Sequence, residues 1–186
     1  MKRLLCEEKV EIPEGCSVEI LERVMTVRGK RATAVRDLSH FVLTMDVHEG
    51  HVRLRLWNGT NRERSKLITC ASVIRNCIVG CMSGYEYTLK VVYKHFPMSV
   101  AIEDDGKTVV VKNFLGQKHA RRYKMRGDSI ARLGTEKDTF VVEGSSLEDV
   151  SQSAGTIQEN CQVKKIDSRT FLDGIYFLSR NVVGAK

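Results

Sequence analysis

The sequence predicts an α+β fold made of two tandem copies of one small domain, each an antiparallel sheet packed with one main helix. Three patterns lead to this expectation: an internal repeat, segments in which apolar and polar residues alternate, and two stretches with a single apolar helical face. At roughly 150 residues per domain, a chain of 186 residues allows either one large domain or two small ones.

The repeat becomes visible when the first half of the chain is shifted by 84 positions. Ile12-Pro13 then falls on Phe96-Pro97, and the Val-rich segment 24–28 falls on 108–112. A period of this length is too long for a solenoid repeat and fits two copies of a small domain.

We therefore expect an N-terminal α+β repeat over residues 1–83 and a C-terminal α+β repeat over residues 84–177. Residues 178–186 are expected to form a short tail.

Strands and helices can be placed within each repeat. The strict alternation of residues 52–56 predicts a strand with its apolar side chains inward and its arginines outward. One helix is expected to begin at Thr60, because Thr60 and Glu63 have the spacing of a capping box. A second helix is expected to begin at Ser145 or Ser146. The two predicted apolar stripes are Leu67, Ala71, Ile74, Ile78 and Cys81 in the first helix, and Leu147, Val150, Ala154, Ile157 and Cys161 in the second.

The sequence contains none of the common catalytic motifs considered below. The chain has no G-x-S-x-G, H-E-x-x-H or P-loop motif. Its six cysteines include no C-x-x-C pair, so we expect free, mostly buried thiols, with a metal site or a Cys/His nucleophile as weaker alternatives. Asp105-Gly106 and Asp173-Gly174 both have the pattern of tight turns. We expect no enzymatic activity, no metal, no cofactor and no small-molecule substrate.

Targeting and membrane signals are also missing from the sequence. No window approaches the roughly 18 uncharged apolar residues that a membrane span requires. Glu7 and Glu8 interrupt the N-terminal segment before an apolar signal core forms. We expect a cytoplasmic protein without a membrane partner.

The charge distribution points to an anionic partner. Lys and Arg total 30 against 23 Asp and Glu, a formal net charge of +7. Six basic residues and no acidic residue occur between positions 112 and 126: Lys112, Lys118, Arg121, Arg122, Lys124 and Arg126. Gly116 lies within this run, where a backbone can approach a phosphate closely, and Tyr123 could stack on a base. The pattern favours contact with folded RNA or with the backbone of a duplex, although a solvated basic face would have the same composition.

Several motifs of the second half occur together in one known family. They are Asn113-Phe114-Leu115-Gly116, Arg121-Arg122, Met125-Arg126, Glu143-Gly144 and Phe171-Leu172-Asp173-Gly174-Ile175-Tyr176. With these motifs, the chain resembles the L-six/L-nine family of large-ribosomal-subunit proteins in its eukaryotic and archaeal form. The resemblance spans nearly the whole chain, and members of this family consist of two tandem α+β domains.

The resemblance implies a structural constituent of the large ribosomal subunit that supports translation. It implies binding to large-subunit rRNA, mainly through the second domain, near the factor-binding region at the stalk base and the sarcin–ricin loop. Neighbouring large-subunit ribosomal proteins would be its other partners. The location would be the cytoplasmic ribosome, with a nucleolar stage during assembly in a eukaryote. An extra-ribosomal RNA-binding or assembly factor of the same fold is the alternative.

Carried over by position, the resemblance also implies a set of RNA-binding residues. They are Lys112, Asn113, Gly116, Lys118, Arg121, Arg122, Lys124 and Arg126, with further contacts from Lys164, Lys165 and Arg169.

Overall fold

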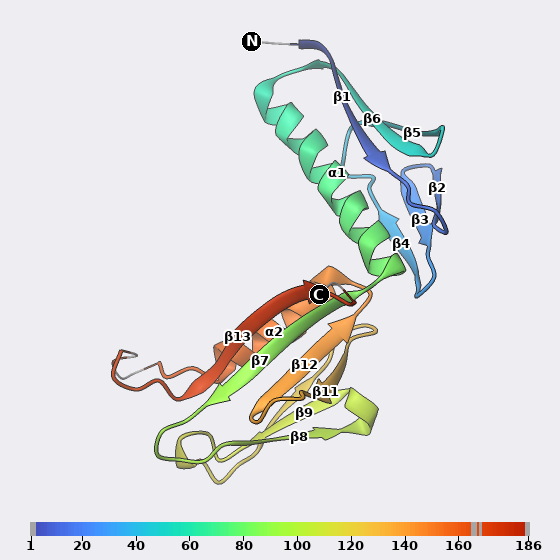
Figure 1. The fold of residues 1–186 in the computed structure, drawn as a ribbon. Coiled ribbons are helices and arrows are strands. Elements are labelled where there is room, and N and C mark those ends of the chain that lie inside the picture. Colours follow the sequence, from blue (N-terminus) through green and yellow to red (C-terminus); the bar gives the residue numbers. More distant parts are fainter. Residues whose placement is uncertain (1–2, 165–166, 168, 185–186) are drawn as a thin grey trace. The chain divides into compact units, whose positions relative to one another are not determined.

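The computed structural model describes residues 3–164, 167 and 169–184. The chain forms two compact units, residues 1–83 and 84–186, which we call the first and second domains. Each domain combines one long helix with two antiparallel sheets (Figure 1), which confirms the predicted α+β class.

The first domain contains two three-stranded sheets, in the orders β1-β6-β5 and β2-β3-β4, and the helix α1. Its elements are β1 (Arg3–Glu11), β2 (Ser17–Leu21), β3 (Val24–Arg28), β4 (Thr33–Asp37), β5 (Thr44–His48), β6 (His51–Gly59) and α1 (Asn61–Met82).

The second domain contains a four-stranded sheet of order β11-β12-β7-β13, a three-stranded sheet of order β10-β9-β8, and the helix α2. Its elements are β7 (Tyr85–Val92), β8 (Ser99–Glu103), β9 (Thr108–Lys112), β10 (Arg121–Lys124), β11 (Ile130–Leu133), β12 (Thr139–Gly144), α2 (Leu147–Asn160) and β13 (Gly174–Val182), with short 3-10 turns η1 (Asp104–Gly106) and η2 (Phe114–Gly116). Asp105-Gly106 thus lies in the turn between two paired strands, as predicted.

The two domains share one topology, and the second has one strand more. The order β7-β12-β11 repeats the order β1-β6-β5, and β8-β9-β10 repeats β2-β3-β4. The additional strand β13 pairs with the side of β7 that β12 leaves open. Residues 179–182 pair with residues 85–88 after a bulge at Leu178, so most of the segment expected to be a tail belongs to the sheet.

The helix α1 begins as the sequence predicts. The Thr60 backbone N–H donates to Glu63 Oε2 at 2.8 Å, and the Glu63 N–H donates to Thr60 Oγ1 at 3.4 Å, so the capping box is confirmed. The predicted stripe of α1 is buried throughout, in one cluster with apolar residues of both sheets. By length and composition, α1 is also apolar enough to cross a membrane, but in this structure its apolar face forms the core of the first domain.

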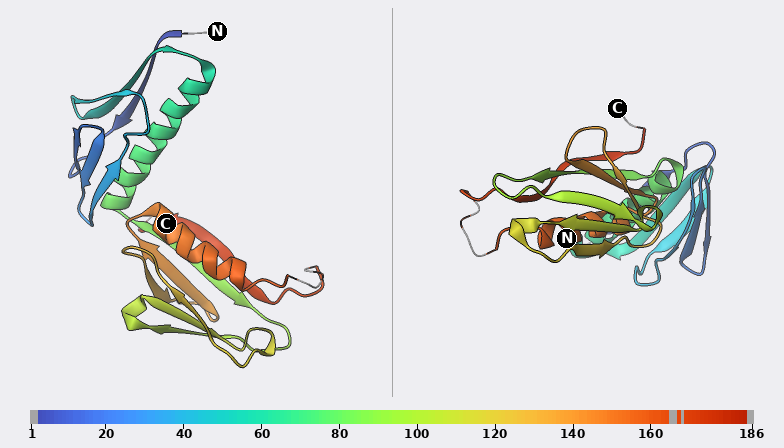
Figure 2. Two further views of the ribbon diagram at one scale, coloured as in Figure 1. Left: turned by 180° about the vertical axis from the view of Figure 1, so that it is seen from behind. Right: turned by 90° about the horizontal axis from the view of Figure 1, so that it is seen from below.

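The helix α2 begins after Ser146, whose Oγ accepts the Asp149 N–H at 3.3 Å. Its stripe is buried from Val150 to Cys161, whereas Leu147 is half-buried. Residues of α2, of β7 and β12, and of β9 form a single core cluster. Therefore α2 and the three-stranded sheet lie side by side against one face of the four-stranded sheet (Figure 2).

All six cysteines are free thiols, as predicted. Cys6, Cys70, Cys81 and Cys161 are buried and pack with the apolar cores. Burial raises the pKa of Cys70 to about 11, which keeps this thiol protonated. Within the described ranges, no group of three His, Cys, Asp or Glu side chains is gathered for a metal ion.

The capping box gives a first prediction. We expect Thr60→Ala to lower the free energy of unfolding of the first domain by about 1 kcal/mol, because one orphan backbone N–H loses its acceptor. Urea denaturation followed by circular dichroism measures this change. Thr69→Ala is the matched control in the same helix, because the Thr69 hydroxyl only bonds back to the Ser65 carbonyl at 2.9 Å. Equal losses in the two variants would contradict the prediction.

Candidate nucleic-acid interface

Three connections of the second domain meet at one end, which we call the loop end. They are residues 93–98 between β7 and β8, residues 113–120 between β9 and β10, and residues 161–164, 167 and 169–173 between α2 and β13. The Asn113 amide donates to the Pro97 carbonyl at 2.9 Å. The Lys94 N–H donates to Asp173 Oδ1 at 2.6 Å. Asp173, expected only to form a turn, is thus a buried acceptor that joins two of the connections.

The connection 113–120 has an unusual backbone. Asn113, Leu115 and Gly116 all have left-handed φ angles, of 60°, 49° and 74°. A Cβ atom at position 116 would lie 3.1 Å from the Phe96 ring, so a side chain there would meet both strain and a close contact. Asn113 and Gly116, predicted to bind RNA, therefore have a demonstrable role in shaping this loop.

Arg121 links the loop to α2. It is half-buried, with Nε donating to Gln117 Oε1 at 3.0 Å and Nη1 donating to the Asn160 carbonyl at the C-terminus of α2. Its guanidinium carbon lies 4.4 Å from the centroid of the Phe114 ring. These contacts position Arg121: its Nε and Nη1 donate within the domain and its plane lies over Phe114, while no described carboxylate pairs with its charge.

Arg122 and Lys124 lie on the opposite face of β10 from Arg121. Successive strand residues alternate in direction, so these two share the outer face of the three-stranded sheet with Lys112 at the end of β9. All three are exposed. Arg122 is 3.7 Å from the Glu103 carboxylate, an exposed ion pair that offsets part of its charge.

The Tyr123 side chain does not lie among the exposed lysine and arginine side chains. It is on the same face of β10 as Arg121 and packs half-buried against the core, with its hydroxyl 3.5 Å from Cys161 Sγ. Burial, followed by the contact with Cys161, raises the pKa of Tyr123 to about 12. The ring thus packs on the core and also lines the groove described below, and its stacking on a base stays a prediction.

The remaining predicted residues are distributed around the domain. Lys118 is exposed in the loop 113–120, and Lys164 is exposed in the connection after α2. Arg169 is exposed in a turn where its N–H donates to Asp167 Oδ1 at 3.0 Å. Arg126 is exposed beyond the far end of β10, and its N–H donates to Ser153 Oγ at 3.0 Å. Lys165 lies outside the described residues.

A groove of about 670 Å³ joins the loop to the C-terminus of α2. It brings Arg121 and Lys164 together, although they are far apart in sequence. The lining residues are Phe114, Leu115, Gln117, Arg121, Tyr123, Asn160, Gln162, Val163 and Lys164.

The structure thus separates the predicted residues into two surfaces and one outlier. The loop end contains Asn113, Gly116, Lys118, Arg121, Lys164 and Arg169, while the outer sheet face contains Lys112, Arg122 and Lys124, and Arg126 lies apart.

Two exposed basic residues of the loop end, Lys94 and His95, were missed by the sequence analysis. They precede Phe96, whose ring lies against Gly116. Phe96-Pro97 is part of the internal repeat. The basic pair directly before it is the sequence feature that could have predicted a further RNA contact.

The two faces of β10 give a second prediction. Arg121→Ala should lower the free energy of unfolding of the second domain by about 2 kcal/mol, because hydrogen bonds from a charged donor are lost. Arg122→Ala is the matched control and should change it by less than about 1 kcal/mol, since an exposed ion pair contributes little. Urea denaturation of both variants tests the assignment, which fails if Arg122→Ala is the more damaging change.

Tyr123 gives a third prediction. Because its pKa in the folded state, about 12, exceeds its ordinary value of 10, its stabilising contribution is complete below pH 10 and is lost as the pH rises towards 12. The difference in unfolding free energy between the wild-type protein and Tyr123→Phe should therefore shrink over this pH range. Denaturation curves measured at several alkaline pH values test this, and a constant difference would contradict it.

Comparison with known proteins places the whole chain in one family. No family model matches the chain. The large ribosomal subunit protein uL6 of Candida albicans is 38% identical, over 98% of this chain and 98% of its own length. Protein uL6B of Saccharomyces cerevisiae is 39% identical over 95% and 94% of the two chains, and uL6 of the archaeon Methanosarcina mazei is 36% identical over 92% and 95%.

These relatives confirm the resemblance that the motifs of the second half indicated. The chain therefore belongs to the uL6 family of large ribosomal subunit proteins, which are structural proteins of the ribosome and not enzymes.

Proposed function

We propose that this protein binds large-subunit rRNA through the loop end and the outer sheet face of its second domain. On the family resemblance, the bound RNA belongs to the factor-binding region near the stalk base and the sarcin–ricin loop. Neighbouring ribosomal proteins contact the rest of the surface, in cytoplasmic ribosomes and, in a eukaryote, in nucleolar assembly intermediates.

The observation that carries the proposal is a set of uncompensated cations. Lys112, Lys118 and Lys164 are exposed, and none of them forms an ion pair with a carboxylate of residues 3–164, 167 or 169–184. A phosphate can bind such lysines without displacing an internal partner, and each contact releases counterions from the RNA.

Arg121, Asn113 and Gly116 support these cations indirectly. Arg121 fixes the loop against α2, while Asn113 and Gly116 hold the left-handed backbone turns. A shaped loop recognises the form of folded RNA because its cations are held at set positions before binding. Arg122 and Lys124 extend the basic surface along the outer sheet face from Lys112.

A charge reversal tests the proposal. The triple variant Lys112→Glu, Lys118→Glu, Lys164→Glu should lose incorporation into large subunits at least about tenfold, because three phosphate contacts become repulsive. Its melting curve should stay close to that of the wild-type protein, since all three side chains are exposed. Sucrose-gradient fractionation of cells that express a tagged copy measures incorporation.

The matched control reverses three exposed cations of the first domain that form no ion pair with a described carboxylate: Lys30→Glu, Arg62→Glu, Arg75→Glu. This variant has the same change in net charge and should be incorporated nearly normally. Equal incorporation of the two triple variants would overturn the assignment to the second domain. A wash at high salt separates the alternative role, because an assembly factor leaves mature subunits where a structural constituent stays bound.

A further inference from the structure

We propose that the free edge of β1 in the first domain pairs with an extended basic segment of another large-subunit protein, which adds one strand to the sheet. The inference rests on the proposed contact with neighbouring ribosomal proteins, and it deepens that proposal by naming the surface and the chemistry of the partner. It concerns a different part of the chain from the loop end and the outer sheet face of the second domain.

One side of the β1 backbone is left without a partner strand. Among the described residues β1 pairs with β6 alone, in an unbroken register of residues 3–11 with residues 51–59 (Figure 1). The Ile12 N–H donates to the Gly50 carbonyl at 2.9 Å, on the β6 side. Since backbone N–H and C=O groups alternate in direction along a strand, those of every second residue point away from β6. These residues are Leu5, Glu7, Lys9 and Glu11.

This edge lacks most of the features that prevent strand pairing in other proteins. Such features are short edge strands, prolines, bulges and exposed lysines. β1 has nine residues, whereas the edge strands β2, β4 and β5 have five each. It contains no proline, and its register with β6 has no bulge. Its one lysine, Lys9, has the Glu7 carboxylate at 3.9 Å as a counter-ion.

The second domain shows that this side of the fold accepts a strand. β7 is the counterpart of β1, and β13 pairs antiparallel with the side of β7 that corresponds to the free edge. Within the described residues the first domain has no strand of its own at this position. A strand from another chain would complete the same four-stranded sheet. We expect it to run antiparallel to β1, as β13 does to β7.

The acids at one end of the free edge define the charge of the partner. Glu8 and Glu11 lie in the second half of β1, Glu14 follows it, and none of them forms an ion pair with a described cation. Glu7 differs, because Arg53 Nε lies 3.5 Å from its carboxylate. Lysine or arginine side chains directly opposite the unpaired acids would be favourable, since opposite charges across a strand pair attract.

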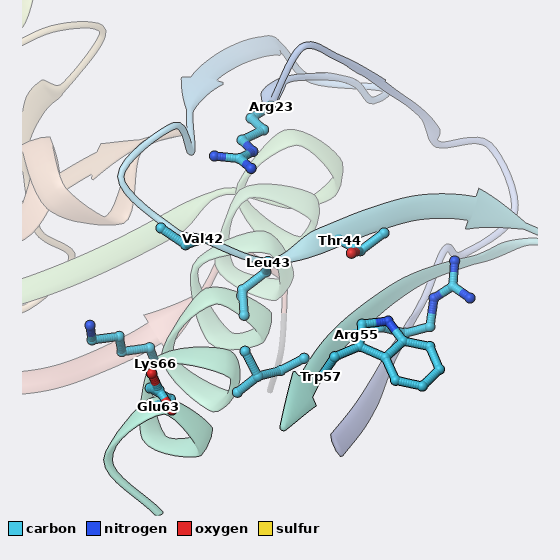
Figure 3. A pocket seen from close by; sticks show the side chains of 9 residues that line it. Arg23, Val42, Leu43, Thr44, Arg55, Trp57, Glu63 and Lys66 are labelled. Carbon is cyan, nitrogen blue, oxygen red and sulfur yellow. The ribbon is translucent and has the colours of Figure 1, made fainter. Parts of the chain in front are cut away.

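The other end of the free edge is apolar. Leu5 lies directly opposite Trp57 on the solvent face of the sheet, and 39% and 56% of their surfaces are exposed. Trp57 and Arg55 extend from this same face of β6 (Figure 3). Leu4 is exposed on the other face of the sheet. An apolar residue of an added strand would extend the row formed by Leu5 and Trp57 and remove Leu5 from water.

An extended basic segment fits these features better than RNA or a second copy of the chain. RNA has no peptide groups to pair with the free edge, and the unpaired acids repel its phosphates. A second copy in a full antiparallel overlap would place Leu4 and Leu5 opposite the acidic end of the other β1. Because the added strand is antiparallel, it carries its basic residues first and its apolar residues last.

Peptide binding to the full-length protein tests the proposal. The probe is a labelled peptide with the length of β1, nine residues, with lysines in its first half, valines in its second half and threonines between them. Fluorescence anisotropy measures its affinity. We expect binding, and a loss of about fivefold at low salt when the lysines are replaced by glutamates. A parent peptide that fails to bind, or a glutamate peptide that binds equally, would overturn the proposal.

Methylation of the peptide separates strand pairing from general electrostatic attraction. Alternate amides of an added strand face β1, and the others face solvent. N-methylation of the set that faces β1 should weaken binding at least about tenfold, because main-chain hydrogen bonds supply the affinity in strand addition. The peptide methylated on the other set has the same composition and is the matched control. Equal affinities of the two methylated peptides would exclude pairing with the free edge.

A proline variant tests the edge from the protein side. Lys9→Pro should weaken peptide binding about tenfold, because it removes an N–H that points away from β6 and leaves the bonds between β1 and β6 intact. Lys9→Ala, which loses the same ion pair with Glu7, is the matched control and should bind at least as tightly as the wild-type protein. If circular dichroism shows that Lys9→Pro is unfolded, the two methylated peptides decide. A concentration-dependent dimer that the peptide fails to dissociate would instead assign the edge to a second copy.

A charge variant tests the acidic end. Glu11→Lys should weaken binding of the basic peptide about fivefold at low salt, because an attraction becomes a repulsion. Glu22→Lys is the matched control, since Glu22 is an exposed acid without a described ion pair in the turn between β2 and β3. It should leave the affinity unchanged, and equal losses in both variants would refute the role of the acidic end.

The triple reversal of Lys112, Lys118 and Lys164 separates this inference from the proposed RNA contact. That variant should bind the peptide as the wild-type protein does, because its changes lie in the second domain. If the peptide fails to bind while the triple variant loses incorporation, the strand addition is wrong and the RNA contact stands. If the peptide binds while the triple variant is incorporated normally, the strand addition stands and the RNA contact fails.

Discussion

The basic surface of the second domain depends on the contacts of one side chain. Arg121 joins Gln117 in the loop, Phe114 in the adjoining turn and the last carbonyl of α2. Without it, the connection 113–120 would keep the buried Phe114 ring, the Asn113 amide bond and the packing of Gly116 on Phe96, but would lose its link to the end of α2. Lys118 in this connection would then sample more positions, and ordering it on RNA would cost conformational entropy at the moment of binding. The internal contacts of Arg121 thus help an exposed lysine of the loop to bind RNA.

Much of the fold could be predicted because its signals are local. The capping box at Thr60 and Glu63 depends on residues three apart, and the stripe of α1 repeats with the period of a helix. The alternation of residues 52–56 similarly identifies the two faces of β6. The duplication was visible because both domains keep the same order of strands around the same helix. Each of these features can be recognised from the sequence of a single helix or strand, or from the similarity between the two halves of the chain.

The candidate site was predicted less completely, because its organisation depends on contacts across the fold. Arg121 and Arg122 are adjacent arginines in the sequence. Only the pairing of β10 with β9 shows that one faces the core and the other faces outward. The same pairing places Tyr123 beside Cys161, a contact between residues 38 positions apart. Asp173 had the pattern of a turn, but its role as the acceptor for Lys94 depends on a residue 79 positions away. A run of basic residues predicts that a basic surface exists. The register of the strands determines which of these residues belong to it.

The strand β13 gives the two domains different relations to their surroundings. In the second domain it covers the side of β7 that would otherwise be an edge, whereas the corresponding side of β1 in the first domain has no strand beside it among the described residues. At this open edge, 76% of the surface of Leu4 is exposed to solvent. An unpaired edge with apolar side chains is a template for intermolecular strand pairing and hence for aggregation. The isolated polypeptide is therefore most vulnerable between its synthesis and its burial in a larger particle, and this vulnerability lies in the half of the chain that carries fewer of its proposed RNA contacts.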